Sequence, residues 1–589
     1  MGSAYDGIYT SNHTKGYIAT NLYAQYAQTF GKHEVKLMVG TNYEQETYKY
    51  MFMHRNKKLF EGAEDIALTT GSQNINSDYY KWRIGSGFFR ANYVFADRYL
   101  FEVNGRYDGS SKFPTIQQWK FFPSASFGWR VSQEPFWKIS PDAISNLKFR
   151  VSYGSLGNGN IAAYRFQELF SLNTQDRLLN GSKNLSTSVP SPIPAGLTWE
   201  TATTANFGMD LGLFNDKLTF VGDYYIRKTT GMYCAGTELP AVYGASAPKG
   251  NYADMTTRGW EIVLTWKDQF NLGGKPLSYE IKGTLADSKS IIDSYPNDEK
   301  YIGAGAGTGI QNFNYYSGMT LGEIWGFEND GYFTSADFDA SGKQIAGPNQ
   351  SWVQNNNSRT WQAGDIKFKD LDGNGKIDFG NSKVGDSGDR KVIGNKLPRY
   401  TYSLNLNFGW NGIFLSAFLQ GVGHQDWWAG GDNSMFWGQY SRPYSNIPAD
   451  MIGNWWTPDN PDAYWPRYTG YIAHQGSRTL HIPQTKYLQN VGYIRLKNLQ
   501  VGYSLPKRWI DAVKMQTVKL YVSGENLWCW SPLYKHSKQF DVNSIMGEDS
   551  ETLSLVHSGL YSSPIMADGG SNYSYPILKA FTFGISVTF

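Results

Sequence analysis

The chain has 589 residues, with 54 Lys and Arg against 51 Asp and Glu, and this near balance excludes the basic surface that a nucleic-acid-binding protein needs. Charged residues make up only 18% of the chain, yet no run of about 18 apolar residues is present, which excludes a transmembrane helix. Aromatic residues reach 16% and Gly numbers 63, a mixture typical of many strands joined by turns.

The predicted strands are joined by connections that are alternately short and long. The short connections, in chain order, are Gly31–His33, Ala96–Arg98, Asn215–Asp216, Leu272–Lys275, Trp410–Gly412 and Leu505–Lys507. The longer connections cover 158–198, 230–253, 290–398, 425–486 and 529–575. This alternation separates about 15 strands, and a soluble sandwich has no reason to divide short from long loops so strictly.

The last nine residues form the most regular predicted strand. Apolar side chains occupy every second position of Phe581–Phe589, with small or hydroxyl residues between them. Because a strand has a period of two residues, one face of this segment is apolar and the other is polar. The chain ends on the aromatic Phe589, and together with Val587 and Ile585 this ending is typical of a bacterial outer-membrane barrel. The predicted fold class is therefore all-β: an antiparallel transmembrane β-barrel with long extracellular loops and short periplasmic turns.

The same period assigns side chains either to lipid or to the lumen of the barrel. The strand pair 206–213 and 218–226 alternates as clearly as the last strand does. Outer-membrane lipid is thus one predicted partner, and we expect it to contact Leu211, Leu213, Phe583, Ile585 and Val587. We expect the lumen to contact Asp210, Thr582 and Ser586.

The amino-terminal segment carries no targeting signal. Met1–Asp6 lacks both the basic region and the apolar core of the signal peptide that an outer-membrane protein needs for secretion. Bacterial barrels usually have an even number of strands, whereas the predicted count is odd. We therefore expect the chain to be the carboxy-terminal part of a longer protein, with edge strands near 17–29 and 577–589 that pair with its amino-terminal part.

Several short segments occur together in one order along the chain. They are Gly105–Pro114 with Phe121–Ser126, Leu147–Gly154 followed by Gly157-Asn158, Trp199–Thr201 leading into Asp210–Phe214, Tyr493–Leu499 and Ser523–Leu527. In this order they resemble the SusC/RagA-type TonB-dependent transporters of Bacteroidota outer membranes. The resemblance extends over essentially the whole chain.

The resemblance implies that residues 1–589 are the carboxy-terminal barrel portion of such a transporter, with about 15 of the 22 strands of that barrel class. Members of the family carry a signal peptide, a TonB box and a plug domain before the barrel, and none is visible in this chain. The implied function, in the outer membrane of a Gram-negative cell, is TonB-dependent import of oligomeric nutrients, with oligosaccharide favoured over peptide. The implied partners are a SusD-like surface lipoprotein as a lid, the TonB complex, and the amino-terminal segment with the first strands and the plug.

One loop segment has the spacing of a calcium site. Asp370–Asp378 follows the pattern D-x-D-x-N-G, in which Gly375 makes a sharp turn and oxygen ligands recur at every second position. The family resemblance adds a closing ligand, because a shorter family version ends in an Asp before Val-Ile-Gly, which here is Asp389, with Asp386 as second choice. The predicted ligands are Asp370, Asp372, Asn374, the Lys376 carbonyl, Asp378 and Asp389. The alternative is an Asx-rich turn that binds no metal.

Aromatic residues gather in the predicted loop 425–486. Trp427, Trp428, Trp437 and Tyr440 are candidates for contact with substrate or partner, because flat rings beside acids and amides can stack on sugar faces. The alternative, favoured for most of these rings, is packing within the loops or at the membrane interface.

The sequence shows no catalytic set. Its eight His are scattered without the H-E-x-x-H spacing, and no P-loop is present, so we predict neither enzymatic activity nor an organic cofactor. Two function classes remain open: the barrel of an energised importer, and a soluble all-β protein that binds or cleaves glycans. The terminal strand, the loop lengths and the family segments favour the importer, and the same resemblance disfavours a passive porin.

Overall fold

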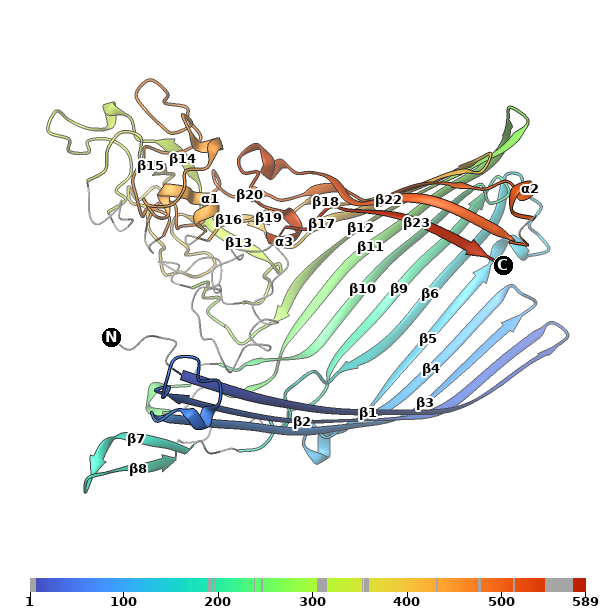
Figure 1. Ribbon diagram of the computed structural model, residues 1–589, viewed down its shortest axis with the longest axis horizontal. Coiled ribbons are helices and arrows are strands. Elements are labelled where there is room, and N and C mark those ends of the chain that lie inside the picture. Colours follow the sequence, from blue (N-terminus) through green and yellow to red (C-terminus); the bar gives the residue numbers. More distant parts are fainter. Residues whose placement is uncertain are drawn as a thin grey trace. The chain divides into compact units, whose positions relative to one another are not determined.

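One large sheet dominates the structure. The computed structural model describes residues 7–168, 170, 172–187, 192–193, 196–237, 239–244, 247–303, 315–351, 353, 360–430, 433–474, 478–511, 514–545 and 576–589. Within these residues, 15 strands form a single sheet in the order β1-β2-β3-β4-β5-β6-β9-β10-β11-β12-β17-β18-β21-β22-β23 (Figure 1). Strands that are neighbours in the sheet also follow one another along the chain, apart from the short strands within the loops. The predicted number of about 15 strands is confirmed.

The strands of this sheet lie between the predicted connections, although β1 begins ten residues before the predicted edge strand near 17–29. They are β1 (Gly7–Phe30), β2 (His33–Asn56), β3 (Gln73–Phe95), β4 (Tyr99–Ser110), β5 (Trp119–Arg130), β6 (Ile144–Asn158), β9 (Glu200–Leu213), β10 (Leu218–Ala235), β11 (Lys249–Leu272), β12 (Lys275–Ser294), β17 (Arg399–Trp410), β18 (Ile413–His424), β21 (Tyr493–Ser504), β22 (Thr517–Trp530) and β23 (Ala580–Thr588).

The remaining elements are short. Small two-stranded sheets pair β7 (Leu172–Leu179) with β8 (Ser182–Thr187), β13 (Glu323–Phe327) with β16 (Arg390–Asn395), β14 (Asn329–Tyr332) with β15 (Ile366–Phe368), and β19 (Asp426–Trp427) with β20 (Gln489–Asn490). The α-helices are α1 (Ser434–Trp437), α2 (Lys507–Ile510) and α3 (Val542–Ile545). No helix of the described residues is long and apolar enough to cross a membrane.

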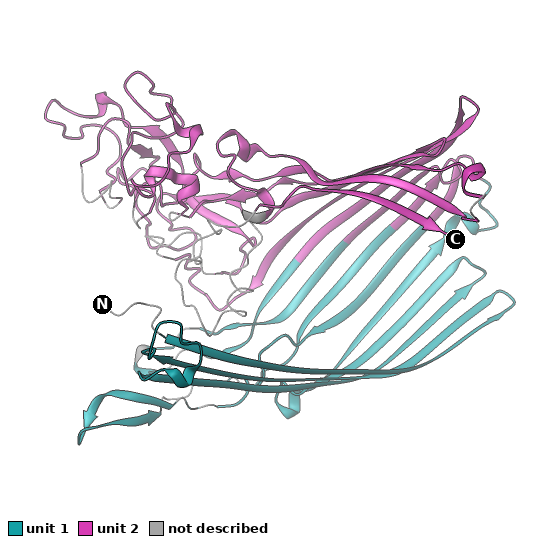
Figure 2. Cartoon of the chain, in the orientation of Figure 1, with its two compact units in different colours: residues 1–138, 148–208, 225–256 teal, residues 139–147, 209–224, 257–589 magenta. Residues whose placement is uncertain are grey.

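The chain divides into two compact units (Figure 2). Unit 1 comprises residues 1–138, 148–208 and 225–256, and it contains β1 to β5 with the small sheet of β7 and β8. Unit 2 comprises residues 139–147, 209–224 and 257–589, and it contains β12, β17, β18 and β21 to β23 with the long loops between them.

The short turns lie where the sequence predicts them. Between β17 and β18, Asn411 and Gly412 both have positive φ angles, of 48° and 88°, as a two-residue hairpin turn of the primed type requires. Such a turn matches the right-handed twist of its two strands and therefore fixes their register. Two connections differ from the expectation. Residues 131–143, between β5 and β6, form a longer segment that includes a short 3-10 helix at Val131–Gln133. The connection predicted at Leu505–Lys507 is also longer, because β21 ends at Ser504, β22 begins only at Thr517, and α2 lies between them.

The register in unit 2 places apolar residues opposite apolar residues. In the ladder of β22 and β23, Val522 pairs with Phe583 and Leu520 with Ile585. On the other face Ser523 pairs with Thr582. The ladder thus confirms that Phe583, Ile585 and Val587 share one face and that Thr582 and Ser586 share the opposite one. In β9, the strand period likewise separates Leu211 and Leu213 from Asp210.

The long loops of unit 2 fold together into a packed body. We call the described residues of 295–398, 425–492 and 531–545 the loop layer; in Figure 1 they carry the yellow-green to red ribbons around β13 to β16, α1, β19, β20 and α3. Its core contains fully buried side chains from all three segments, including Phe327, Phe368, Ile377, Trp428, Trp437, Trp465, Tyr487 and Leu533. The long loops are therefore a structural body with an apolar core of its own, and this body positions the candidate site.

A charge placed on either face of β22 tests the predicted faces. In the complete protein, Val522→Arg is expected to lower the free energy of unfolding by about 2–4 kcal/mol, the cost of Arg near the middle of the bilayer. Ser523→Arg, one residue away on the opposite face, is the matched control and is expected to cost clearly less. Urea unfolding in lipid vesicles measures both values, and equal costs would contradict the assignment of the faces.

Candidate functional site

The predicted calcium segment lies in the loop layer, between β15 and β16. Gly373 and Gly375 have φ angles of +75° and +79°, which confirms the sharp turn at this point. Directly after the turn, Ile377 is fully buried in the core of the loop layer. Its amide donates to the Asn349 carbonyl at 2.9 Å, and the Asn349 amide donates to the Gly375 carbonyl at 2.9 Å. The turn is thus fixed from behind while its acidic residues point away from the core.

Three of the predicted ligands converge. One carboxylate oxygen from each of Asp370, Asp372 and Asp389 lies within 4.8 Å of the other two. Asp370 and Asp372 are at least partly accessible, whereas Asp389 is fully buried. The structure therefore brings the residue before β16 back onto the start of the loop, as the closing position requires.

These carboxylates also accept backbone hydrogen bonds. Asp370 accepts from Gly373 N at 2.7 Å with one oxygen and from Gly375 N at 2.8 Å with the other. Asp389 accepts from the amides of Leu371 at 2.6 Å and Asp378 at 2.8 Å. A carboxylate has about four lone-pair sites, so an oxygen can accept an N–H group and still bind a cation. The same contacts are thus consistent with the calcium site and with the metal-free turn.

The other predicted ligands make local contacts. Asn374 Oδ1 accepts from Lys376 N at 2.7 Å, and Asp378 Oδ1 accepts from Gly380 N at 2.8 Å. Asp386, the second choice for the closing ligand, instead accepts from Asn381 Nδ2 at 2.5 Å. Asp386 therefore stabilises the inserted turn at 381–386, and Asp389 is the residue that reaches the convergent pair.

The electrostatics of the three acids is unbalanced. Burial, with the nearby charges of Asp372 and Asp370, raises the pKa of Asp389 above its usual range although two backbone N–H groups oppose this. Burial also acts to raise the pKa of Asp370, but the N–H groups of Gly375 and Gly373 outweigh it and lower that pKa. The neighbouring Arg390 donates to the Gly303 carbonyl at 3.0 Å and lies over the Phe379 ring at 4.5 Å. In these contacts the Arg390 guanidinium is directed at a carbonyl oxygen and an aromatic ring. A metal cation bound among the three carboxylates would reduce the repulsion between their negative charges.

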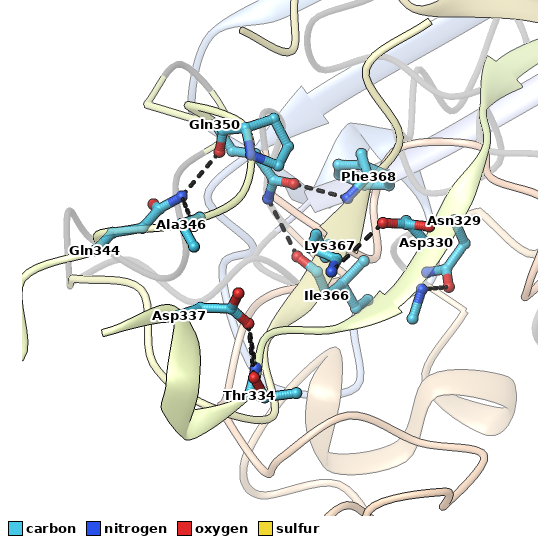
Figure 3. A network of polar contacts seen from close by, with 12 residues as sticks. Asn329, Asp330, Thr334, Asp337, Gln344, Ala346, Gln350, Ile366, Lys367 and Phe368 are labelled. Atoms are coloured by element: carbon cyan, nitrogen blue, oxygen red, sulfur yellow. Dashed lines mark hydrogen bonds and ion pairs between the residues drawn. The ribbon is translucent and has the colours of Figure 1, made fainter. Parts of the chain in front are cut away.

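A buried amide holds the strand that leads into this loop. Gln350 is fully buried; its Nε2 donates to the Ile366 carbonyl at 3.1 Å and its Oε1 accepts from Phe368 N at 2.7 Å. Figure 3 shows these two bonds on either side of Lys367, whose ammonium pairs with Asp330 at 3.4 Å. Gln350 thereby fixes β15, the element that ends just before Asp370. Sequence reasoning missed this residue, because nothing in the local pattern relates Gln350 to a strand that begins at Ile366.

The aromatic candidates lie inside the loop layer. Trp427, Trp428, Trp437 and Tyr440 are all buried, and the last three are fully so. Trp437 Nε1 donates to the Ala429 carbonyl at 3.1 Å, and Tyr440 OH donates to the Pro466 carbonyl at 2.7 Å. Burial raises the pKa of Tyr440, so its hydroxyl stays neutral. These rings pack as the sequence indicated for most of them, and contact with a ligand stays a prediction that their burial does not favour.

Removing the buried amide should loosen the approach to the acidic loop. Gln350→Ala leaves the Ile366 carbonyl and the Phe368 amide without their partner, and each unsatisfied buried group costs about 1–3 kcal/mol. We expect faster hydrogen exchange at Phe368 in the complete protein, measured by mass spectrometry. Gln344→Ala, which removes a side chain bonded to the Ala346 carbonyl at 3.0 Å, is the control and should leave Phe368 unchanged. Unchanged exchange in Gln350→Ala would contradict this role.

Known proteins with similar sequences match nearly the whole chain. The family model described as TonB dependent receptor-like, beta-barrel matches residues 2–527. TonB-dependent receptor P3 of Formosa agariphila is 27% identical over 585 residues, covering 96% of this chain and 52% of that protein. TonB-dependent receptor SusC of Bacteroides thetaiotaomicron is 25% identical over 594 residues, covering 97% of this chain and 50% of that protein.

Solved structures agree on the fold. The RagAB peptide transporter superposes with a TM-score of 0.69 at 19% identity, covering 99% of this chain and 56% of that one. The chain therefore spans about half the length of the curated relatives and the solved structure that it matches. The family resemblance derived from the sequence segments is confirmed.

Proposed function

Because the chain belongs to the TonB-dependent receptor β-barrel family, whose members are Gram-negative outer-membrane proteins, we propose that it forms the barrel wall of an energised importer of oligomeric nutrients. The observation that carries this proposal is the sheet of 15 strands with an apolar and a polar face, which is what a barrel in lipid requires. Matches over 96% and 97% of the chain to receptors of this family support it.

The exposed apolar face argues against the soluble alternative. Leu22, Val39 and Tyr153 are 69%, 60% and 64% exposed and lie on strands of unit 1. Large contiguous apolar surfaces of this kind are rare on soluble monomers and need a cover, here lipid. Because the relatives are receptors and transporters by name, the absence of enzymatic activity is part of the same proposal.

The nutrient is proposed to be an oligosaccharide, with peptide as the alternative. Aromatic side chains beside carboxylates on the strands, such as Tyr17 next to Glu44 and Tyr80 next to Glu46, favour sugars, since rings stack on apolar sugar faces while polar groups bind hydroxyls. The name of one structural neighbour states that it transports peptides, which keeps the alternative open.

Two further partners belong to this proposal. A SusD-like surface lipoprotein would close the importer from outside, and the TonB complex would supply energy through the amino-terminal plug segment. In the loop layer, Tyr444, Ile447 and Ile452 are 75%, 50% and 67% exposed. Exposed apolar side chains within one loop, between β18 and β21, support a protein partner on this surface.

Uptake in cells tests the proposed function. We expect a strain that lacks the complete protein to lose uptake of a labelled oligosaccharide, and an uncoupler of the membrane potential to abolish uptake in the parent strain. Surface binding of the sugar should persist after uncoupling, because binding needs no energy. The same assay is run with a panel of labelled sugars and peptides. If uptake of every compound survives the deletion, or survives uncoupling, the protein is not an energised importer.

We further propose that Asp370, Asp372 and Asp389 hold a calcium ion, with Asn374, Asp378 and the Lys376 carbonyl as additional ligands. The convergence of three carboxylates within 4.8 Å supports this, as does the D-x-D-x-N-G spacing. The ion would neutralise their charge and link the start of the loop to β16. Its role would be structural, holding an extracellular loop.

Calcium should therefore protect this loop in the complete protein. We expect calcium to slow limited proteolysis within 370–390, and Asp389→Asn to abolish the effect by removing the buried ligand. The matched control is Asp339→Asn, because Asp339 also accepts backbone N–H groups of its own turn, from Ser341 and Lys343, but lies outside the convergent group. Equal protection with and without calcium would favour the metal-free turn.

A further inference from the structure

Six aromatic and imidazole rings lie together on one face of β1, β2 and β3 in unit 1. We call this group the aromatic wall; its members are His13, Tyr17, Tyr48, Tyr50, Tyr80 and Trp82. None of them belongs to the loop layer or to the candidate calcium site.

The register of the three strands creates the wall. His13 pairs with Tyr50 across β1 and β2, and Tyr48 pairs with Tyr80 across β2 and β3. Tyr17 and Trp82 both pair with Glu46, from its two sides. Since paired residues and their second neighbours point to one side, all six rings share a face.

This face is the one opposite to the apolar lipid-facing residues. Leu22 and Val39 differ from the wall by an odd number of positions along β1 and β2, so they lie on the other side of the sheet. Both are largely exposed, as expected for contact with lipid. The wall therefore faces the lumen.

The wall also lies above the hydrocarbon layer. Behind it, the outward face carries three cations, with Thr14 paired to Lys49, Thr47 to Lys81 and Gln45 to Arg83. The apolar Ile18 and the ring of Tyr79 lie among them, opposite Gln45 and Lys49. Charged side chains on the outward face are costly near the middle of the bilayer, so this level lies at or beyond the edge of the hydrocarbon layer. The rings of the wall are consequently not membrane anchors, and their gathering needs another reason.

The rings are arranged as a platform edged by polar groups. Tyr48 and Tyr80 stack at 4.9 Å with an angle of 21° between planes, and His13 lies 4.6 Å from Tyr50. Tyr17 OH donates to Glu44 at 3.0 Å, and Tyr80 OH donates to Glu46 at 2.9 Å. Ring faces are thus held in place by hydrogen bonds at their edges.

The charges of the wall are partly matched from within, and the carboxylates of Glu44 and Asp78 on the same face make it acidic, which disfavours an anionic ligand. Glu46 is buried and forms an ion pair with Lys15 at 3.0 Å. The ammonium of Lys112 lies 4.9 Å from the centre of the Trp82 ring. A charged ligand would have to compete with these internal partners, whereas a neutral ligand would not.

We propose that the aromatic wall binds a neutral oligosaccharide as it passes through the lumen, an inference that rests on the proposed import function. Sugar rings present apolar faces to aromatic rings and hydroxyl groups to carboxylates and phenols, and the wall offers both. A peptide in extended form is read through its main chain by a strand with unpaired N–H and C=O groups. At the wall, β2 is paired on both sides by β1 and β3. The other edge of β1, the first strand of the sheet, is the one expected to pair with the amino-terminal segment of the complete protein.

The test compares two faces of the same strand in the complete protein. The double variant Tyr48→Ala with Tyr80→Ala removes the stacked pair, while Tyr79→Ala removes an outward-facing ring one residue away. Calorimetry and tryptophan fluorescence measure binding of maltohexaose, cellohexaose, xylohexaose and laminarihexaose, with hexagalacturonate and a casein digest as charged and peptide probes. We expect at least one neutral hexasaccharide to bind the unmodified protein and Tyr79→Ala equally, and the double variant about tenfold or more weakly.

A conservative variant separates binding from folding. Tyr48→Phe with Tyr80→Phe keeps both rings and is expected to retain most of the affinity, and heat-modifiability on gels reports whether each barrel is formed. The inference is overturned if the folded alanine variant binds the hexasaccharide as tightly as the unmodified protein does. It is also overturned if the unmodified protein binds only the charged or peptide probes, or binds no probe at all. If uptake is energised but insensitive to the alanine variant, the proposed function stands and this inference fails.

Discussion

The pairing of backbone groups across neighbouring strands is the interaction on which the rest of this structure depends. In lipid, an N–H or C=O group without a partner costs several kcal/mol, so a chain that crosses a bilayer as strands must pair each of them with its neighbours. The ladders of β1 with β2 and of β2 with β3 extend without interruption over their whole length. Once this pairing is fixed, only the type of side chain can vary at each position of a strand. Because side chains alternate with a period of two, they point in turn toward the lipid and toward the lumen.

The same constraint explains where the irregular chemistry lies. Turns such as Asn411-Gly412 close a hairpin with only two residues, which leaves no room for a site. The long loops of the loop layer instead form a core of their own around Trp437, Trp465 and Tyr487. That core supports the acidic turn from below through Ile377 and Gln350. The convergence of Asp389 on Asp370 and Asp372 therefore depends on buried residues that are not ligands themselves.

Sequence reasoning succeeded where a local period or spacing carries the information. The faces of β23, the turn at Gly375 and the strand number follow from residues that are neighbours in the chain. It failed where two distant segments meet. The bonds from Gln350 to β15 and the stacking of Tyr48 on Tyr80 depend on registers between separate strands or loops, which no local pattern specifies. The loop tryptophans show the converse limit, since the sequence located the cluster but could not say which ring faces would be covered.

Strand length connects these observations. A strand crosses the hydrocarbon layer with about 9–11 residues, yet β1 and β2 have 24 residues each and β3 has 23. The extra length is paired as regularly as the part in lipid. Its backbone is therefore already ordered in the folded protein, and binding a ligand there loses no further backbone entropy. Freed from contact with lipid, its outward face carries Lys49, Lys81 and Arg83, and its inward face is open to selection for ligand contact. An importer that must hold a passing chain needs such a preorganised surface, and long paired strands supply it more precisely than mobile loops do.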